Sequence, residues 1–172
     1  KGPEHFYRGA LGETVIAHLK AKGGTLTMAD LGKVAPRWRE PIAAAYRDRL
    51  VHVPPPACEG FQFLLTLRIL DGFELAGLER NGVEHLDIVY RAIRLAAGRR
   101  IAHNNPKPEK LAELMSDASV EKLRARLRDG QPITGPTEQW MAEAPAGEDP
   151  AHTTSFSIAD REGNLICVTQ SI

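Results

Sequence analysis

The feature that most constrains the fold of this chain is an abrupt change of pattern at Gly130. Before it, apolar residues recur mostly at helical spacing. From Gly130 to His152, four prolines, three glycines and several acids replace that periodicity. After His152, two short stretches alternate apolar and polar residues, as β-strands do. The sequence therefore predicts a helical part, then a loop or mobile arm over 130–152, then a terminal β-hairpin.

Local signals place the first helices and a first hairpin. Apolar residues at i, i+4 and i+8 predict one amphipathic helix over 6–20, ended by Gly23–Gly24. Thr27 and Asp30 stand at capping-box spacing and predict the start of a second, short helix. Residues 39–53 place a turn-like pair between two apolar stretches and predict a hairpin, closed by Pro54–Pro56.

The middle of the chain is predicted to be helical. Residues 58–73 are apolar nearly all round, which is typical of a helix buried between layers. The following helix is marked by one apolar stripe, formed by Leu86, Val89, Tyr90, Ile93 and Ala97. Residues 103–110 break the pattern, and two shorter helices are expected at about 108–115 and 119–128. Helices followed by strands indicate a layered α+β domain.

Composition limits the classes of function. With 172 residues, of which 42% are hydrophobic, the chain can form one globular unit with a core. Lys plus Arg and Asp plus Glu are 22 each, so no net field attracts nucleic acid, and no nucleic-acid partner is predicted. The basic cluster from Arg124 to Gly130 is interpreted as the solvated face of a helix.

No metal or cofactor site is predicted. The six histidines form no pair at i+3 or i+4 and have no neighbouring cysteine ligand. No glycine-rich turn has the spacing of a phosphate-binding loop. Cys58 and Glu59 are interpreted as residues at a helix start, and the alternative interpretation is a reactive Cys58 with His52 as its partner. Cys167 is interpreted as a small buried apolar residue on a strand.

The chemistry is expected at Thr153–Thr154, where the last hairpin begins. The simplest interpretation is strand propensity plus a turn hydroxyl. The functional interpretation is that the Thr153 hydroxyl attacks the carbonyl group before it and the chain is cut. The freed α-amine, with a pKa of about 7.7–8.0, then serves as the base for the same hydroxyl.

Five motifs carry a resemblance to a known family. They are "KGPEHFYRG", "GGTLTMADL", "REPIAAAYR", "PPPACEG" and "TTSFSIADREGNLICVTQSI", in this order. The chain resembles the γ-glutamyltranspeptidases, which are autoprocessing N-terminal nucleophile hydrolases with an αββα sandwich. The resemblance implies that 1–152 is the C-terminal part of a large subunit, and that 153–172 is the first hairpin of a small subunit.

The resemblance also implies site residues. Thr153 would be the nucleophile and, through its α-amine, the base, and the autocleavage site would be the His152–Thr153 bond. Ser171, and more weakly Thr169, would supply supporting hydroxyls, and no cofactor is called for. The family's oxyanion-hole glycines and carboxylate-binding residues have no match between Lys1 and Ile172, so the chain is expected to be a central fragment that is inactive alone.

Several substrates and partners are implied. Glutathione and related γ-glutamyl amides would donate the acyl group, with water or an amino acid as acceptor. Departures such as Ser155, "PPPACEG" and residues 98–106 keep open an amidase or acylase acting on a glutaryl β-lactam or polyglutamate. A non-catalytic scaffold relative is the third alternative. The missing parts of both subunits are expected partners. Self-association of the fragment through its strand edges is also expected. The location is expected to be periplasmic or secreted, with the cytoplasm as the alternative.

Overall fold

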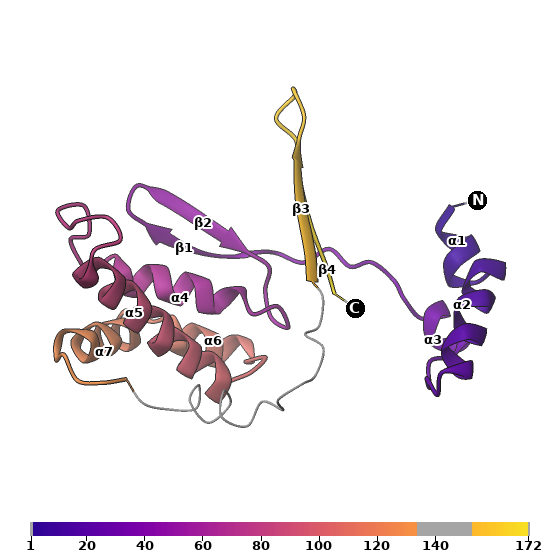
Figure 1. The fold of residues 1–172 in the computed structure, drawn as a ribbon, viewed down its shortest axis with the longest axis horizontal. Coiled ribbons are helices and arrows are strands. Elements are labelled where there is room, and N and C mark those ends of the chain that lie inside the picture. Colours follow the sequence, from indigo (N-terminus) through magenta and orange to yellow (C-terminus); the bar gives the residue numbers. More distant parts are fainter. Residues whose placement is uncertain (1, 134–152, 172) are drawn as a thin grey trace.

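The computed structural model describes residues 2–133 and 153–171. Its helices are α1 (Gly2–Tyr7), α2 (Ala10–Ala21), α3 (Met28–Gly32), α4 (Gly60–Leu70), α5 (Val83–Ala102), α6 (Pro108–Leu114) and α7 (Asp117–Arg128). Its strands are β1 (Ile42–Tyr46), β2 (Arg49–Val53), β3 (Thr153–Ala159) and β4 (Leu165–Ser171). Figure 1 shows the three groups that these elements form: α1–α3, the body of α4–α7 with β1 and β2, and the β3–β4 hairpin.

The helices α1, α2 and α3 pack on one another at the start of the chain. The prediction of a single helix over 6–20 is wrong, because the helical structure is interrupted at Gly9, between α1 and α2. A Cβ atom at Gly9 would lie 3.0 Å from the His5 carbonyl oxygen, so this tight bend suits a glycine. The predicted end of α2 is confirmed, since Gly23 adopts a left-handed φ of 85°.

The predicted capping box at the start of α3 is confirmed. The Thr27 hydroxyl accepts a hydrogen bond of 3.2 Å from the Asp30 amide, and the Asp30 carboxylate accepts one of 3.1 Å from the Thr27 amide. These bonds satisfy amide groups that a helix start leaves without intrahelical partners. After α3, the chain runs on to β1 without regular structure over residues 34–41 (Figure 1).

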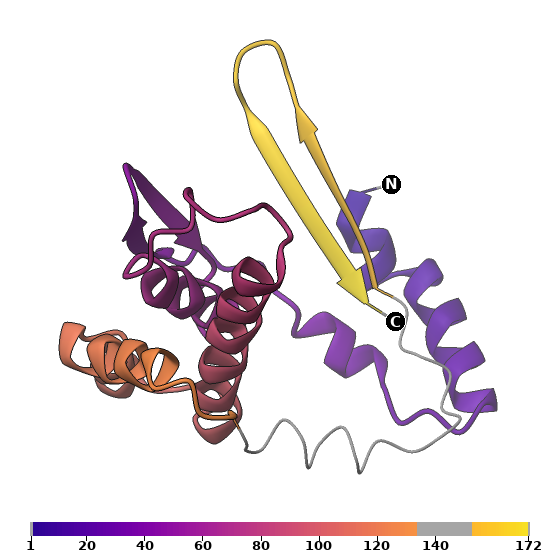
Figure 2. The same cartoon turned by 60° about the vertical axis from the view of Figure 1, so that its left-hand side comes forward.

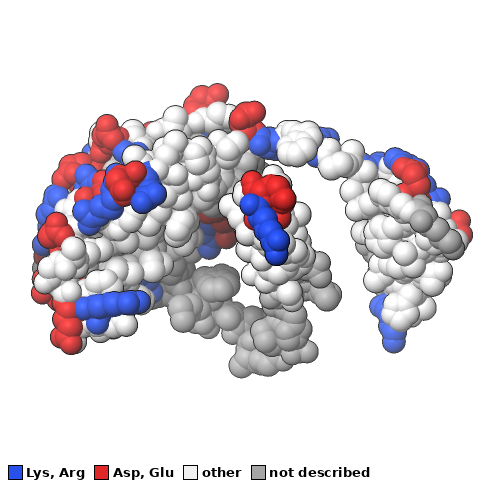
Figure 3. Space-filling model, turned by 90° about the horizontal axis from the view of Figure 1, so that it is seen from above, with Lys and Arg blue, Asp and Glu red and all other residues white. Residues whose placement is uncertain are grey.

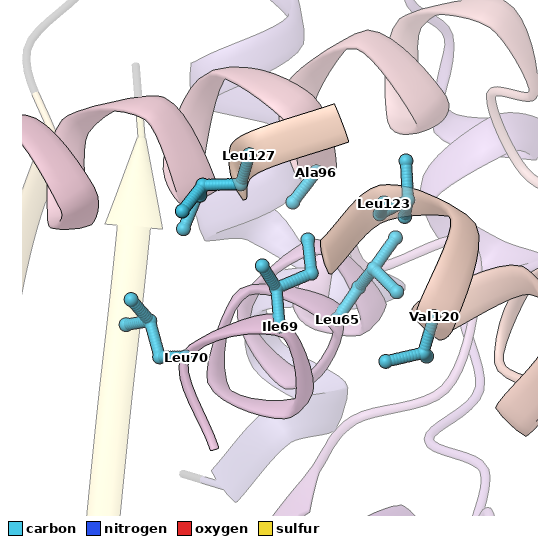
Figure 4. Close-up of a cluster of buried hydrophobic side chains, with 8 residues drawn as sticks. Leu65, Ile69, Leu70, Ala96, Val120, Leu123 and Leu127 are labelled. Carbon is cyan, nitrogen blue, oxygen red and sulfur yellow. The ribbon is translucent and has the colours of Figure 1, made fainter. Parts of the chain in front are cut away.

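The body of the molecule is built around α4. As predicted, this helix is buried on most of its surface, with Phe61, Leu64, Leu65 and Ile69 almost inaccessible to solvent. Its side chains meet those of α5 and α7 in one hydrophobic cluster (Figure 4). The buried members of the cluster are Leu65, Ile69, Leu70, Ala92, Ala96, Val120, Leu123 and Leu127. The predicted helices near 108–115 and 119–128 are confirmed as α6 and α7.

The face of α5 that packs in this core differs from the predicted apolar stripe. The fully buried residues of α5 are Ala92 and Ala96, whose small side chains allow α4 to approach closely. Leu86, Tyr90 and Ile93 of the predicted stripe are 50%, 59% and 43% exposed. Within the described part of the chain, this larger apolar face of α5 is therefore only partly covered.

The predicted first hairpin is confirmed as β1 and β2. The strands pair antiparallel, with Ala44 opposite Val51, around a tight turn in which Arg47 has a φ of 55°. The Asp71 carboxylate at the end of α4 accepts a hydrogen bond of 3.1 Å from the Arg47 amide. This contact fixes the turn against the α4 end of the body.

The predicted terminal hairpin is confirmed as β3 and β4, which pair antiparallel over their whole length. The hairpin extends away from the α4–α7 body in both views of the ribbon (Figures 1 and 2). Positive and negative side chains are interspersed over the face of the body that Figure 3 shows. Among residues 2–133 and 153–171, no helix is long and apolar enough to cross a membrane.

Candidate functional site

The register of the terminal hairpin brings the predicted site positions together. Thr153 is the first residue of β3, and its partner across the hairpin is Ser171 in β4. Thr169 lies opposite Ser155, two residue pairs further along the same ladder. Directly opposite residues of an antiparallel pair have Cα atoms about 4.5–5.5 Å apart. The fold thus groups positions 153, 169 and 171 at the open end of the hairpin.

The turn at the other end of the hairpin sets this register. The Asp160 carboxylate accepts hydrogen bonds of 2.8 Å from the Asn164 amide and 2.7 Å from the Asn164 side chain. These bonds, the side-chain bond foremost, hold the pKa of Asp160 below its usual range. Gly163 has a φ of 86°, a conformation that glycine adopts readily. The turn predicted from "DREGN" is therefore confirmed.

Other parts of the predicted site lie outside the described residues. His152 and residues 134–151 of the predicted arm belong to this part, so the scissile bond His152–Thr153 stays a prediction. Of the arm, only residues 130–133 are described. The roles assigned to Thr153, Thr169 and Ser171 are likewise predictions that the backbone register accommodates.

The structure agrees with the predicted role of the segment around Cys58 but not with the predicted burial of Cys167. Cys58 is a free, exposed thiol that lines a shallow pocket together with His52, Trp38 and Pro54–Pro56. Its neighbour Glu59 is the N-cap residue of α4 and forms a 2.5 Å ion pair with Arg100. This fits the predicted structural role of the segment at a helix start.

The prediction for Cys167 is wrong within the described part of the chain. Its thiol is exposed rather than buried, and it accepts a 3.3 Å hydrogen bond from the Ser157 hydroxyl across the hairpin. The physical reason is that the two strands of this hairpin contact mainly each other. Alternation along a strand identifies its faces but not the layer that covers them.

A second hollow was not predicted from the sequence. A cleft of about 990 Å³ lies between β1, α4, α6 and α7. Its charged groups are paired: Arg68 with Asp117, Arg124 with Glu121 at 3.4 Å, and Asp71 with Arg47 at 3.8 Å. Arg124 also donates a 2.6 Å hydrogen bond to the Arg68 carbonyl oxygen. The charges that line the cleft therefore largely cancel one another. The lining residues are far apart in the sequence, so no local sequence pattern predicts the cleft.

The basic cluster from Arg124 to Gly130 is only partly the solvated face that was predicted. The side chains of Arg126 and Arg128 are 39% and 49% exposed, whereas that of Arg124 is only 23% exposed. Arg124 packs against Gly72, because a Cβ atom added at Gly72 would lie 2.5 Å from the Nε atom of Arg124. In the described ranges, no group of three or more His, Cys, Asp or Glu residues is placed to hold a metal ion.

Comparisons with known proteins agree with this architecture. The solved structure of Helicobacter pylori gamma-glutamyltranspeptidase superposes with a TM-score of 0.68 at 23% identity, covering 86% of this chain and 44% of that one. The described part of the chain therefore shares the fold of that structure, and its helices with a terminal hairpin confirm the predicted α+β class.

Sequence comparisons identify the family. The family model described as Gamma-glutamyltranspeptidase matches residues 1–172, and this chain belongs to that family. The Acylase ACY 1 proenzyme of Pseudomonas sp. (strain V22) is 31% identical, and the Glutathione hydrolase proenzyme of Pseudomonas sp. (strain A14) is 29% identical. Both alignments cover all of this chain and 30% of the relative. The chain thus spans about a third of the length of these curated relatives.

Proposed function

We propose that this chain belongs to an autoprocessing enzyme that transfers or hydrolyses γ-glutamyl groups, with Thr153 as its nucleophile. The observation that carries the proposal is the place of Thr153: it begins β3, directly opposite Ser171, in a chain of this family. The relatives named glutathione hydrolase support glutathione and related γ-glutamyl amides as acyl donors.

The proposed maturation step uses the hydroxyl of Thr153. The oxygen attacks the carbonyl carbon of residue 152, and the peptide bond to the Thr153 nitrogen breaks, which leaves an ester. The Thr153 α-amine is already free in this ester. Water then hydrolyses the ester, which releases the Thr153 hydroxyl and the carboxylate of residue 152. An internal amide nitrogen cannot accept a proton, whereas the free amine can, so only as a chain terminus does Thr153 carry its own base for attack on a substrate.

In the proposed turnover, the Thr153 amine takes the hydroxyl proton as the oxygen attacks the γ-amide carbonyl of the donor. The leaving amine receives the proton, and a γ-glutamyl ester of Thr153 remains. Water or an amino acid then attacks the ester and regenerates the hydroxyl. The hydroxyl positions 169 and 171 are proposed to support the nucleophile, and the groups that stabilise the oxyanion are proposed to come from parts of the protein beyond this chain.

A second candidate function is an acylase of the same fold that acts on another acyl group. The specific observation in its favour is the 31% identity with the Acylase ACY 1 proenzyme, which covers the whole chain. A glutaryl β-lactam or a polyglutamate then takes the place of the γ-glutamyl amide, while the Thr153 chemistry stays the same. Assays of the full-length protein on γ-glutamyl-p-nitroanilide and on a glutaryl amide separate the two functions.

The test of the proposed nucleophile is Thr153→Ala in the full-length protein, with Thr154→Ala as the matched control. We expect intact-mass analysis to show two chains, the second starting at Thr153, for the parent and for Thr154→Ala. Thr153→Ala is expected to remain one chain without acyl transfer. Unchanged maturation and activity in Thr153→Ala would overturn the proposal, and a single uncut parent chain would favour a non-catalytic scaffold.

The wider assignments follow from the same proposal. Residues 1–152 are proposed to end the large subunit and 153–172 to begin the small one, with the remainder of both subunits as partners. Export to the periplasm or the medium is proposed because bacterial members of the family are usually exported. Fractionation of cells that express the full-length protein tests the location, since recovery in the cytoplasm alone would contradict it.

A further inference from the structure

The first hairpin of the body has one edge that the described residues leave open. β1 and β2 form a sheet of two strands that packs along α4 (Figure 1). β1 pairs with β2 on one side, and no main-chain hydrogen bond from elsewhere in residues 2–133 or 153–171 reaches residues 42–45. The other edge of β1 is therefore open in the described part of the chain.

The register shows which main-chain groups this open edge presents. Tyr46 and Arg49 flank the two-residue turn and form the first hydrogen-bonded pair of the ladder. Opposite residues of antiparallel strands alternate between pairs that exchange both hydrogen bonds and pairs that exchange none. Ala44 therefore belongs to a bonded pair, whereas Ala43 and Ala45 belong to unbonded pairs. The N–H and C=O groups of Ala43 and Ala45 thus point away from β2.

The cleft of about 990 Å³ lies along this open edge. Four consecutive residues of β1, 42–45, line it. Successive side chains of a strand point to opposite faces, so a hollow that is lined by four residues in a row lies at the edge of the strand. At about 3.3 Å per residue, these residues offer about 10 Å of edge, which is enough for an extended segment of about four residues.

The lining of the cleft suits an uncharged segment. The arginines and carboxylates of the cleft are paired with one another or with Arg47, so they leave little net charge to attract a charged ligand. Much of the remaining lining is apolar, including Leu64, Leu111, Met115 and Val120. An extended segment with apolar side chains fits this lining, and its main chain matches the free groups of Ala43 and Ala45.

The sequence of β1 lacks the features that protect an exposed strand edge. Edge strands in solvent usually carry charged residues, proline or a bulge, which prevent pairing with other strands. Residues 42–45 are Ile-Ala-Ala-Ala, and the register of β1 with β2 contains no bulge. β2, by contrast, carries Arg49 and His52. The open edge of β1 therefore favours a partner strand over solvent.

We propose that the open edge of β1 receives a strand from the part of the full-length protein that lies outside residues 1–172. The alignments with the curated relatives cover 30% of their length, so most of a protein of that length lies outside this chain and can supply the strand. The added strand bonds to the main-chain groups of Ala43 and Ala45 and places apolar side chains in the cleft. This inference does not depend on the chemistry proposed for Thr153.

Hydrogen exchange at single residues of the full-length protein tests for the added strand. The Ala44 amide is the internal reference, because it already bonds to β2. We expect the amides of Ala43 and Ala45 to exchange within about tenfold of the Ala44 rate, after correction for intrinsic rates, because all three are then bonded in one sheet. Exchange of both amides at more than about ten times the Ala44 rate would overturn the proposal.

The same measurement on the 172-residue chain, at a concentration at which it is monomeric, identifies the source of the strand. There we expect Ala43 and Ala45 to exchange more than about tenfold faster than Ala44. Protection of both amides in this chain alone would assign the partner to residues 1–172 and overturn the proposal. Protection in the full-length protein that is lost on dilution would assign the partner to a second copy, with the same consequence.

A proline at position 43 tests the edge directly. Ala43→Pro removes an outward N–H group and leaves the bonds to β2 in place, as proline does on an edge strand. In the full-length protein we expect it to raise Ala45 exchange about tenfold, while Ala44 keeps its rate. Ala43→Ser is the matched control, since it retains the N–H group and should leave Ala45 at the parent rate. Unchanged Ala45 exchange in Ala43→Pro, or equal acceleration in Ala43→Ser, would contradict the added strand.

The outcomes are separate from those of the proposed function. If Ala43→Pro does not fold, the exchange rates of the parent protein still decide the question. A full-length protein that is never cut at Thr153 can protect Ala43 and Ala45, in which case the proposed function fails and the added strand stands. A cut and active protein in which both amides exchange freely overturns the added strand alone.

Discussion

At the scale of single residues, polar side chains at the ends of elements fix where those elements begin. Thr27 is the clearest case, because its hydroxyl and the Asp30 carboxylate bond to each other's amides. Thr27→Ala leaves the Asp30 amide without its partner, and we expect α3 to lose about 1 kcal/mol of local stability. Hydrogen exchange of the α3 amides measures this loss.

The matched control for this change is Thr14→Ala. The Thr14 hydroxyl bonds to the Ala10 carbonyl oxygen within α2, where the main chain is already paired and alanine is a better helix former. We expect Thr14→Ala to leave the exchange of α3 unchanged. Equal acceleration in both variants would mean that the capping box does not hold the start of α3.

Asp160 makes the terminal hairpin sensitive to acid. Hydrogen bonds from the Asn164 side chain and amide lower its pKa in the folded hairpin. A lowered folded pKa means that this stabilisation is complete above the unfolded value of about 4, and that it is lost as the pH falls through the lowered pKa. The protection of the Asn164 amide against exchange, followed by NMR from neutral to acid pH and corrected for the intrinsic pH dependence of exchange, should therefore fall on acidification.

The control for the acid effect is Asp160→Asn, which cannot ionise. After correction for the intrinsic pH dependence of exchange, its Asn164 amide is expected to show no step in the acid range. A step of equal size in this variant would assign the acid sensitivity to another group. Arg161 and Glu162 are the other charged residues of the turn, so Glu162→Gln completes the set.

At the scale of elements, α4 carries the stability of the body. Ile69 is fully buried against α5 and α7, whereas Phe63 on the same helix is 54% exposed. Ile69→Ala removes buried methyl groups and leaves a cavity, and should lower the free energy of unfolding by about 2–5 kcal/mol. Phe63→Ala should lower it by less than about 1 kcal/mol. Urea unfolding followed by circular dichroism compares the two, and a larger effect of Phe63→Ala would contradict the packing described.

Helices, strands and turns could be predicted where they depend on residues close together in the sequence. The contacts between these elements could not be predicted. The "DREGN" turn fixes the hairpin register, so the pairing of positions 153 and 171 follows from the sequence once the turn is placed. The break at Gly9 was missed because it depends on a close approach to the His5 carbonyl. The hydrogen bonds from Arg91 and Arg94 to the carbonyl groups of residues 131 and 133 were missed because the partners are up to 40 residues apart in the chain. Periodicity shows which face of α5 is apolar, but not which elements cover it.

At the scale of the whole molecule, the described chain leaves apolar surface uncovered. Phe156 and Ile158 lie opposite Val168 and Ile166, so the four share one face of the terminal hairpin. Three of them, Phe156, Ile158 and Ile166, are 47%, 56% and 54% exposed. Position 153 belongs to the alternate set, with Ser155 and Ser157. The predicted chemistry and the apolar face are thus assigned to opposite sides of the hairpin.

This apolar face predicts self-association of the isolated chain. A two-stranded hairpin that packs on nothing is marginal in water, and open strand edges pair readily with other copies. We expect the mass measured by sedimentation velocity to rise with concentration. Phe156→Lys with Ile166→Lys should shift the chain toward the monomer, because two charges on the face oppose its burial.

The matched control places the same charge on the other side of the hairpin. Ser157→Lys lies between Phe156 and Ile158 in sequence but on the opposite face, so it should leave association close to that of the parent chain. If the parent is monomeric at all concentrations, the apolar face does not drive association. If Ser157→Lys disperses the chain as strongly as the double variant, the effect is one of net charge, and the apolar face is not the contact.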